Sequence, residues 1–274
     1  MTVTPNSELR AIKIVIQRDL IRTYQDRTRF ISQLVQPLLF LFVLGSGLGS
    51  LTKGATGSID LKTFMFPGIL ATSTLFTAMF SAISIVWDRE FGFLREMLVA
   101  PVRRSSIIIG KALGGALIAT AQAILVLALA PIVHVPLTVP LAITLLAEVF
   151  LLSFTLTSFG LAIVAQIKQM QTVMGLMQML LLPLSFLSGA MYPLSNLPQW
   201  LSVAVRFNPL TYAVHPVRTA VFNHLDLPPE VVSRLNPPIT WGGWVVPIWL
   251  QLALVAGIGL SLLALAVRQF QQVE

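Results

Sequence analysis

Charged residues and cysteine are what this chain lacks most. Only 11% of its 274 residues are Asp, Glu, Lys or Arg, and 55% are hydrophobic, whereas a soluble domain carries about 25% charged residues. A soluble fold that exposed so few charges would not stay dispersed. The absence of cysteine excludes disulfides, cysteine-ligated zinc and a cysteine nucleophile. The composition therefore predicts an integral membrane protein without thiol chemistry.

Several motifs that carry chemistry are also missing. No Gly-x-x-x-x-Gly-Lys-Ser/Thr run occurs, so the chain cannot hold ATP phosphates by that device. The glycine run at residues 45–50 follows no strand and is predicted to be a helix exit or a close packing site. His134 has no second ligand at metal spacing, and we expect neither a metal nor a cofactor. The formal net charge of +7 comes from basic residues beside apolar runs and does not indicate nucleic acid.

Six apolar runs are predicted to cross the membrane as helices. A bilayer core of about 30 Å needs about 20 apolar residues in a helix. The runs cover residues 30–52, 63–87, 107–130, 141–165, 172–189 and 245–267. The predicted fold class is therefore all-α and integral to the membrane. A transmembrane domain at 30–268 lies between a start at 1–29 and a tail at 269–274.

The distribution of Lys and Arg predicts the orientation. With six spans both termini lie on one side, which carries 13 of the 18 basic residues against 5 on the other. Because basic residues concentrate in cytoplasmic loops, we expect both termini and the polar segment at residues 88–104 to be cytoplasmic. The bilayer would be the plasma membrane, of the bacterial inner-membrane type.

Residues 8–24 have a partial helical stripe. Its apolar members are Leu9, Ile12, Ile16 and Leu20. The pattern favours an amphipathic helix lying on the cytoplasmic leaflet. A solvated basic tail is the alternative.

The polar segment at 88–104 stands between two long uncharged runs. If it is helical, Trp87, Phe91, Leu94 and Leu98 share one face, while Phe93 and Met97 project nearly opposite. Two apolar faces divided by charges indicate a helix held between its own membrane domain and a soluble partner, with Pro101 ending it. The alternative is a solvated loop whose charges only set the topology.

Two polar side chains inside the apolar runs are candidates for a substrate path. Glu148 lies in the fourth run, where an ionised carboxylate costs about 2.5–3.5 kcal/mol on insertion scales if it is central. Gln36 precedes Pro37 in the first run. For Glu148, a residue that snorkels, is protonated or bonds a neighbouring helix is the alternative, and both readings stay open.

Residues 189–243 are apolar but are broken too often by Pro and Asn for a regular span. Short re-entrant helices in the outer leaflet fit better. We expect Ser195 or Asn196 as the cap and Tyr192 and Trp200 as interfacial anchors. A polar loop that contains Arg218, Asp226, Glu230 and Arg234 is predicted to follow.

Two stretches together resemble a known family. The run from Glu90 to Arg104, with Gly110-Lys111 behind it, is similar to the cytoplasmic loop of type 2 ATP-binding-cassette (ABC) permeases. The run from Ser188 to Leu201, followed by Asn208-Pro209-Leu210-Thr211-Tyr212 and Arg218, resembles the second signature of that family. The two signatures occur in the expected order within one topology, and the resemblance covers the whole chain. Phe93 stands where the family often has Thr.

The resemblance implies an exporter built from two copies of a six-helix subunit, each served by a separate ATPase subunit that carries ATP and Mg²⁺. The amphipathic start would be the connecting helix, and the loop at 88–106 the coupling helix seated in a groove of the ATPase. The coupling residues would be Glu90, Gly92, Phe93, Leu94, Arg95, Glu96, Met97, Leu98, Ala100, Pro101 and Arg103. The outer gate would comprise Gly189, Pro193, Pro198, Asn208, Pro209 and Arg218.

The expected function is therefore a permease subunit of an ATP-driven exporter, not itself an enzyme. Its cargo would be an amphiphilic, lipid-linked, glycan or drug-like compound, because the family moves drugs, glycolipids, lipo-oligosaccharides or polysaccharides outward. The alternative is an ion-coupled secondary transporter. Such proteins usually place several ionisable groups at the midplane, whereas only Glu148 is offered here. The sequence also lacks the set of catalytic residues that an intramembrane enzyme would need.

Overall fold

The computed structural model describes residues 5–47, 49, 60–93, 97, 102–195, 197–225, 227–241 and 243–273, and these are helical almost throughout. The first half contains α1 (Pro5–Gln25), α2 (Arg27–Leu39), the π-helix η1 (Phe40–Leu44), α3 (Gly45–Gly47), α5 (Leu61–Ala82), α6 (Ser84–Glu90) and α8 (Arg104–Leu127). The second half contains the 3₁₀-helix η2 (Ala130–Val133), α9 (Val139–Val164), α10 (Met170–Phe186), α11 (Gln199–Phe207), α12 (Thr211–Phe222), α13 (Pro229–Leu235), β1 (Thr240–Trp241), β2 (Trp244–Val245) and α14 (Ile248–Val273).

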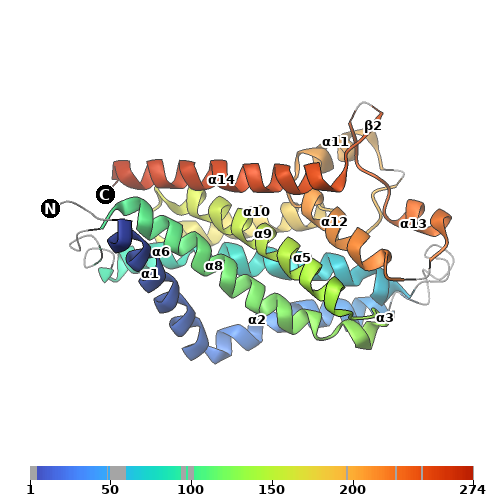
Figure 1. Ribbon diagram of the computed structural model, residues 1–274, viewed down its shortest axis with the longest axis horizontal. Coiled ribbons are helices and arrows are strands. Elements are labelled where there is room, and N and C mark those ends of the chain that lie inside the picture. Colours follow the sequence, from blue (N-terminus) through green and yellow to red (C-terminus); the bar gives the residue numbers. More distant parts are fainter. Residues whose placement is uncertain are drawn as a thin grey trace.

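The long helices run along the longest axis of the molecule (Figure 1). Both chain ends lie at one end of this bundle, near α1 and α6, and α11, α13 and the hairpin lie at the opposite end. Within the described part of the chain, four helices are long and apolar enough to cross a membrane: Leu61–Glu90, Arg104–Leu127, Val139–Val164 and Ile248–Gln272. Two shorter apolar helices cover Ile31–Gly47 and Met170–Phe186. The predicted all-α membrane fold is confirmed for the described residues, apart from the two-residue strands.

The last helix begins later than predicted. Val245, the predicted start, belongs to β2, which pairs with β1 through Thr240↔Val245 and Trp241↔Trp244. The turn between the strands contains Gly243 at φ +88°, a conformation that favours glycine. Pro247 then precedes the first residue of α14, because the fixed φ of proline suits the start of a helix.

Small residues allow the long helices to pack closely. Thr155 of α9 donates its hydroxyl to the Val255 carbonyl of α14 at 2.9 Å, and a Cβ on Gly259 would lie 2.6 Å from the Thr155 hydroxyl oxygen. Likewise, a Cβ on Gly160 would lie 2.6 Å from the Cβ of Ala82 in α5. Such contacts bring backbones together where lipid gives no hydrophobic driving force between helices.

The amphipathic start is helical as predicted, and its apolar stripe is not the face that packs on the protein. Leu9 is 67% exposed and Leu20 37%. The buried positions are Ala11, Val15 and Asp19, which recur every four residues. They pack on α8, where a Cβ on Gly110 would lie 2.8 Å from Val15 Cβ. Small side chains occupy this face of α1 because the backbones of α1 and α8 approach each other closely.

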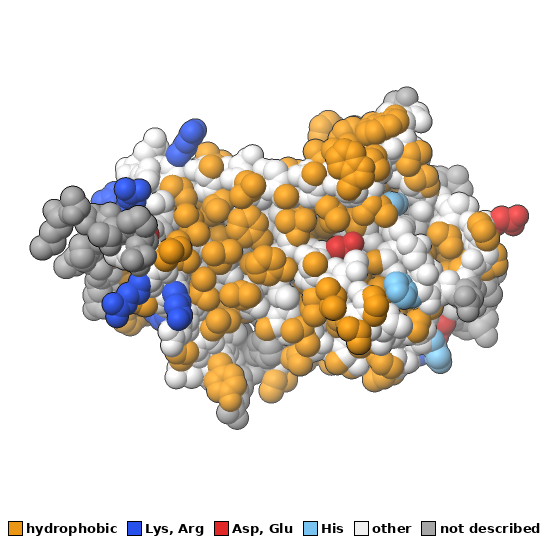
Figure 2. Space-filling model, viewed as in Figure 1, with side chains coloured by type: hydrophobic (Ala, Val, Ile, Leu, Met, Phe, Trp, Pro, Cys, Tyr) orange, Lys and Arg blue, Asp and Glu red, His pale blue; other side chains and the backbone are white. Residues whose placement is uncertain are grey.

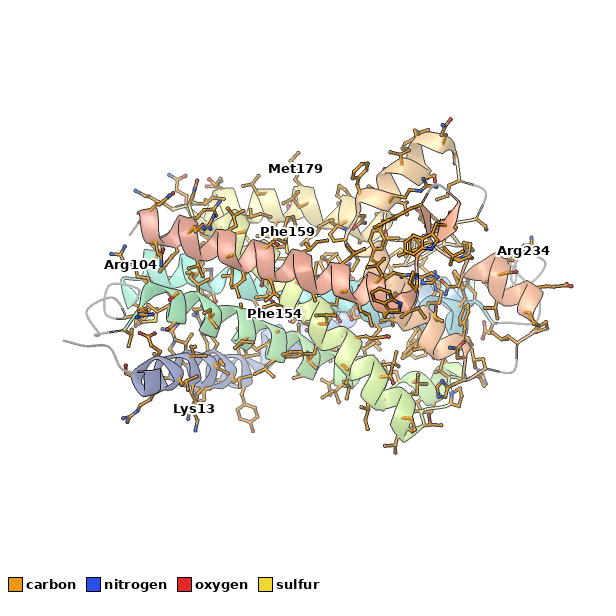
Figure 3. The ribbon with its side chains drawn as sticks, turned by 45° about the horizontal axis from the view of Figure 1, so that its top comes forward. Lys13, Arg104, Phe154, Phe159, Met179 and Arg234 are labelled. Carbon is orange, nitrogen blue, oxygen red and sulfur yellow. The ribbon has the colours of Figure 1, made fainter. Side chains whose placement is uncertain are left out.

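The surface divides into zones. Apolar side chains cover the middle of the face in Figure 2, and Lys and Arg side chains gather towards the end of the molecule that holds the N-terminus. In Figure 3, Lys13 and Arg104 lie at that end, Arg234 lies at the opposite end, and Phe154, Phe159 and Met179 lie between them. An apolar middle between two polar ends is the surface that a bilayer requires.

Candidate functional site

The polar segment begins as the end of a helix and turns away from it. α6 ends at Glu90, and Gly92 adopts φ +82°, a left-handed conformation that ends helices. The predicted helix that would carry Trp87, Phe91, Leu94 and Leu98 on one face is therefore interrupted at Gly92. The candidate residues Leu94, Arg95, Glu96, Leu98, Ala100 and Pro101 lie outside the described residues.

The described residues of the segment point in different directions. Phe91 is 66% exposed and Phe93 52%, and Glu90 is also exposed. Met97 is half-buried, packs against the core of the membrane domain and accepts a hydrogen bond at Sδ from Arg18 at 3.5 Å. Phe93 and Met97 were both predicted to face a soluble partner. The side chain of Phe93 is exposed and can contact such a partner, whereas Met97 packs against its own chain.

Five charged side chains form a cluster where the segment leaves the membrane domain. This charge cluster consists of Arg18, Asp19 and Arg22 from α1, Asp88 from α6 and Lys111 from α8. Lys111 Nζ lies 2.6 Å from Asp88 Oδ2 and 2.9 Å from Asp19 Oδ1. Arg18 also hydrogen-bonds Asp88 Oδ2. These three helices are therefore joined through charge at one point.

The charged groups of the cluster are buried, and each of them therefore needs an opposite charge beside it. Asp88 and Lys111 are each 2% exposed and Asp19 is 5% exposed. Removing one partner of such a group leaves an uncompensated charge and costs about 3–5 kcal/mol. Arg22 contributes a looser contact, 3.6 Å from Asp88 Oδ1, and stacks over Trp87 at 4.9 Å from the ring centroid. Displacement of Asp88 must therefore be followed by α1 and α8.

The other contacts of the segment also lead to the membrane helices. Arg89 donates to the carbonyls of Ala165 and Ile167, at 2.9 and 2.7 Å, in the turn between α9 and α10. At the far end, the Arg103 N–H donates to Glu8 Oε1 of α1 at 3.2 Å. Arg104 donates to the Gln271 carbonyl of α14 at 3.2 Å. Both ends of the segment are thus fixed to the bundle.

A second polar site lies at the opposite end of the bundle, and we call it the outer latch: Gly189, Ala190, Asn208 and Arg218. Arg218 is 2% exposed and donates to the carbonyls of Gly189 and Ala190, both at 2.9 Å. Its guanidinium lies 4.5 Å from the Phe64 ring centroid. The prediction that Arg218 lies in a polar loop is wrong, because this residue belongs to α12. The chain turns at Gly189, with φ +71°, and the carbonyls at this turn accept hydrogen bonds from the buried guanidinium.

The remaining residues of the second signature surround this latch. Asn208 donates to the Leu184 carbonyl at 2.8 Å and accepts from the Leu210 N–H at 3.0 Å. Pro198 is the N-cap residue of α11, which has no side-chain cap, so Ser195 does not cap this helix as predicted, and the alternative cap Asn196 lies outside the described residues. Pro193 lies in the turn before α11, and Pro209 in the turn between α11 and α12. The structure thus brings Gly189, Asn208 and Arg218 together.

The two candidates for a substrate path are not brought together. Glu148 is half-buried and lies seven residues before Thr155, hence on the face of α9 that meets α14. Its Oε2 is buried without a hydrogen-bond partner in the described part of the chain. Gln36 is exposed on α2, a helix that packs against α1, α5 and α8.

The arrangement can transmit movement but offers little for covalent chemistry. Across the described residues, no three His, Cys, Asp or Glu side chains gather as metal ligands. Paired charges instead tie a cytoplasmic-type loop to several long apolar helices. These features define a multi-pass, largely α-helical membrane protein.

The comparison with known families agrees with this class. Residues 10–222 match the family described as ABC-2 type transporter, and the chain belongs to that family. The resemblance found in the sequence is therefore confirmed. As a permease of this family the chain is not an enzyme itself, because ATP hydrolysis belongs to a separate subunit.

Relatives with related names extend over most of the chain. A protein described as a transport permease, ycf38 of Cyanophora paradoxa, is 28% identical over 225 residues, which cover 79% of this chain and 76% of the relative. Nodulation protein J of Rhizobium leguminosarum bv. trifolii is 27% identical over 71% of this chain and 74% of its own. The doxorubicin resistance permease DrrC of Mycobacterium tuberculosis is 24% identical over 79% and 81%.

Sequence reasoning missed Asp19 and Lys111 as site residues. They are 92 positions apart, and no local pattern joins them. One signal was present: Lys111 lies about two turns inside an apolar helix, where a lone ammonium is costly. It therefore required an acid, and Asp19 and Asp88 stand at the same end of their helices.

Proposed function

We propose that this chain is the membrane-spanning subunit of an ATP-driven exporter. Two copies would form the transport path, and each would receive an ABC ATPase subunit that holds ATP and Mg²⁺. The protein would lie in a plasma membrane of the bacterial inner-membrane type with both termini in the cytoplasm. Family membership supports the partnership with an ATPase.

The arrangement of the helices supports six crossings. The four long apolar helices account for four of them. The segment Ile31–Gly47 and α10 supply the other two, since the first is extended by apolar residues beyond the described helix and α10 leads directly into the outer latch. The common position of the chain ends agrees with an even number of crossings (Figure 1).

The charge cluster is the observation that carries the mechanism. The segment from Asp88 to Arg103 is the coupling element, and Phe91 and Phe93 are its exposed apolar contacts for the ATPase. When the ATPase subunits close on ATP, the segment is displaced as a rigid piece. Asp88 then moves α1 and α8, and Arg89 moves the turn between α9 and α10. This repacking alternates access of the path between the two sides.

We infer an amphiphilic cargo from the relatives that are named for doxorubicin resistance and nodulation. Glu148 and Gln36 are proposed to line the route of such a cargo at different depths. The latch residues Gly189, Asn208 and Arg218, with the prolines around them, would form the fixed outer rim of that route.

The test compares two exposed phenylalanines at opposite ends of the bundle. Phe93→Asp should weaken binding of the ATPase to the permease about tenfold or more, because an apolar contact worth about 1.4 kcal/mol or more is lost. Phe207→Asp, at a residue 84% exposed near the outer end, should leave ATPase binding unchanged. Binding and ATP-driven doxorubicin transport are measured after co-reconstitution in vesicles.

Two results would contradict the proposal. Equal ATPase binding by both variants would remove the segment from the ATPase contact. Uptake driven by a pH gradient in vesicles that contain no ATPase would instead establish an ion-coupled transporter.

A further inference from the structure

A cavity of about 360 Å³ lies beside the charge cluster, between α1, α2, α5, α8 and α10. Its lining includes Asp19 and Arg22 of the cluster, together with Ser84 and Trp87, which contact Lys111 and Arg22. It lies at the end of the bundle where the coupling segment leaves the membrane domain. Its volume falls in the range of sites for small organic ligands, about 300–1,000 Å³.

The helix α5 supplies a row of hydroxyl groups to this cavity. Thr77 and Ser81 of α5 line it four residues apart, on one face of that helix, and Ser84, the first residue of α6, continues the row. Gln33 of α2 adds an amide. Its own carbonyl accepts from Gln122 at 3.4 Å, so its side chain is not needed for that bond. The row ends beside Lys111, which donates to the Ser84 hydroxyl at 3.1 Å.

Apolar side chains complete the lining. Phe80, Trp87, Ile118 and Met174 come from four different helices. Of the charged lining residues, Asp19 pairs with Lys111 and Arg22 with Asp88, and Asp26 adds a further carboxylate to the lining. A ligand therefore meets hydroxyl, amide and carboxylate groups, all of which can hydrogen-bond a hydroxyl group, next to apolar and aromatic surface. This chemistry selects an amphiphile whose polar end carries hydroxyl groups.

We propose that this cavity binds the hydroxyl-bearing end of an amphiphilic substrate taken up from the cytoplasmic leaflet. The inference rests on the proposed export function and gives it a loading site and a substrate class. Its size admits one ring system or one sugar and not a polysaccharide chain. Because the cavity shares Asp19 and Arg22 with the charge cluster, occupancy and movement of the coupling segment affect one another, and this coupling must be reciprocal.

The test uses the full-length permease in lipid nanodiscs without its ATPase and follows the fluorescence of doxorubicin as the probe. Met174→Trp places bulk in the cavity from its α10 side and should weaken binding about tenfold, equivalent to about 1.4 kcal/mol. Met179→Trp is the matched control, because it makes the same change on the same helix at a residue 73% exposed that does not line the cavity (Figure 3). It should bind within about twofold of wild type.

A second variant tests the polar end and does not depend on the fit of a tryptophan. Gln33→Leu keeps the backbone and removes the amide. It should weaken binding of the doxorubicin analogue whose sugar carries a hydroxyl group in place of the amine about fivefold through one lost hydrogen bond, and leave binding of the sugar-free aglycone within about twofold. Equal loss for this uncharged analogue and the aglycone would overturn the assignment of the hydroxyl-bearing end to this cavity.

Two further outcomes separate the inference from the function on which it rests. Wild-type binding by Met174→Trp, or equal loss in Met179→Trp, overturns the cavity while ATP-driven transport stands. Retained binding without any ATP-driven transport overturns the exporter alone. Adding a glucosyl diacylglycerol to the nanodisc identifies the source: competition with doxorubicin assigns the site to a membrane glycolipid, and unchanged binding to a free hydroxylated compound.

Discussion

The two ends of the bundle hold their buried charges in different ways. At the inner end, Lys111 is paired with Asp88 and Asp19, with arginines from α1 as alternative partners. At the outer end, Arg218 is held by two backbone carbonyls and an aromatic ring. Side-chain partners can exchange as helices slide, whereas carbonyls of a fixed turn cannot. We therefore propose that the inner end moves during transport and that the outer latch stays in place.

The largest effect is expected from breaking the outer latch. Arg218→Met leaves the carbonyls of Gly189 and Ala190 without their donor, and should destabilise the protein by about 3 kcal/mol. We expect a clearly lower thermal unfolding temperature in detergent and little accumulated protein. Arg234→Met, at an exposed residue of α13, is the control. An unchanged unfolding temperature for Arg218→Met would show that the latch does not hold the outer end.

A smaller loss of stability but a larger loss of function is expected from the charge cluster. In Asp88→Asn, Lys111 keeps Asp19 at 2.9 Å, so the expected destabilisation is only about 1–2 kcal/mol. Transport per ATP hydrolysed should fall about tenfold, within the 1–3 kcal/mol usual for coupling between sites. Vesicles with the ATPase measure both quantities. The exposed Glu230→Gln is the control, and normal transport by Asp88→Asn would contradict the role of the cluster.

The smallest effect is expected where α1 packs on α8. Gly110→Ala places a Cβ 2.8 Å from Val15 Cβ and should cost about 1 kcal/mol by overpacking. In a Val15→Gly background, which removes that Cβ, Gly110→Ala should cost clearly less, and Gly257→Ala, which meets nothing within 4 Å, should cost nothing. An undiminished cost of Gly110→Ala in the Val15→Gly background would show that the strain lies elsewhere than in this contact.

The apolar runs predicted most helices because span length and composition are local properties. The start of the last helix was misplaced since Val245 pairs across a hairpin. The face of α1 that packs on the protein was not predicted, for a different reason. The hydrophobic stripe marks Leu9 and Leu20, which are exposed on the protein, whereas contact with Gly110 selects the smaller Ala11 and Val15.

For the two sites as well, local features could be predicted from the sequence and long-range contacts could not. Both signatures were readable as resemblances, and Gly92 marks a helix end by its own conformational freedom. The pairing of Lys111 with Asp19, or of Arg218 with the turn at Gly189, joins residues far apart in the chain. Such pairings depend on which helices become neighbours, and a charged residue alone therefore reads as solvent-exposed, as Arg218 did.

The π-helix η1 in the first apolar segment has a consequence of another kind. A π turn contains one residue more than the α turn it replaces, and Pro37 stands shortly before it. Relative to a continuous α-helix, the residues after Leu44 are rotated by about 100° around the axis. Without the extra residue, Gly45, Ser46 and Gly47 would lie on another side of the helix. An alignment with a chain one residue shorter must therefore place its gap at η1, so that the positions before and after it keep their faces.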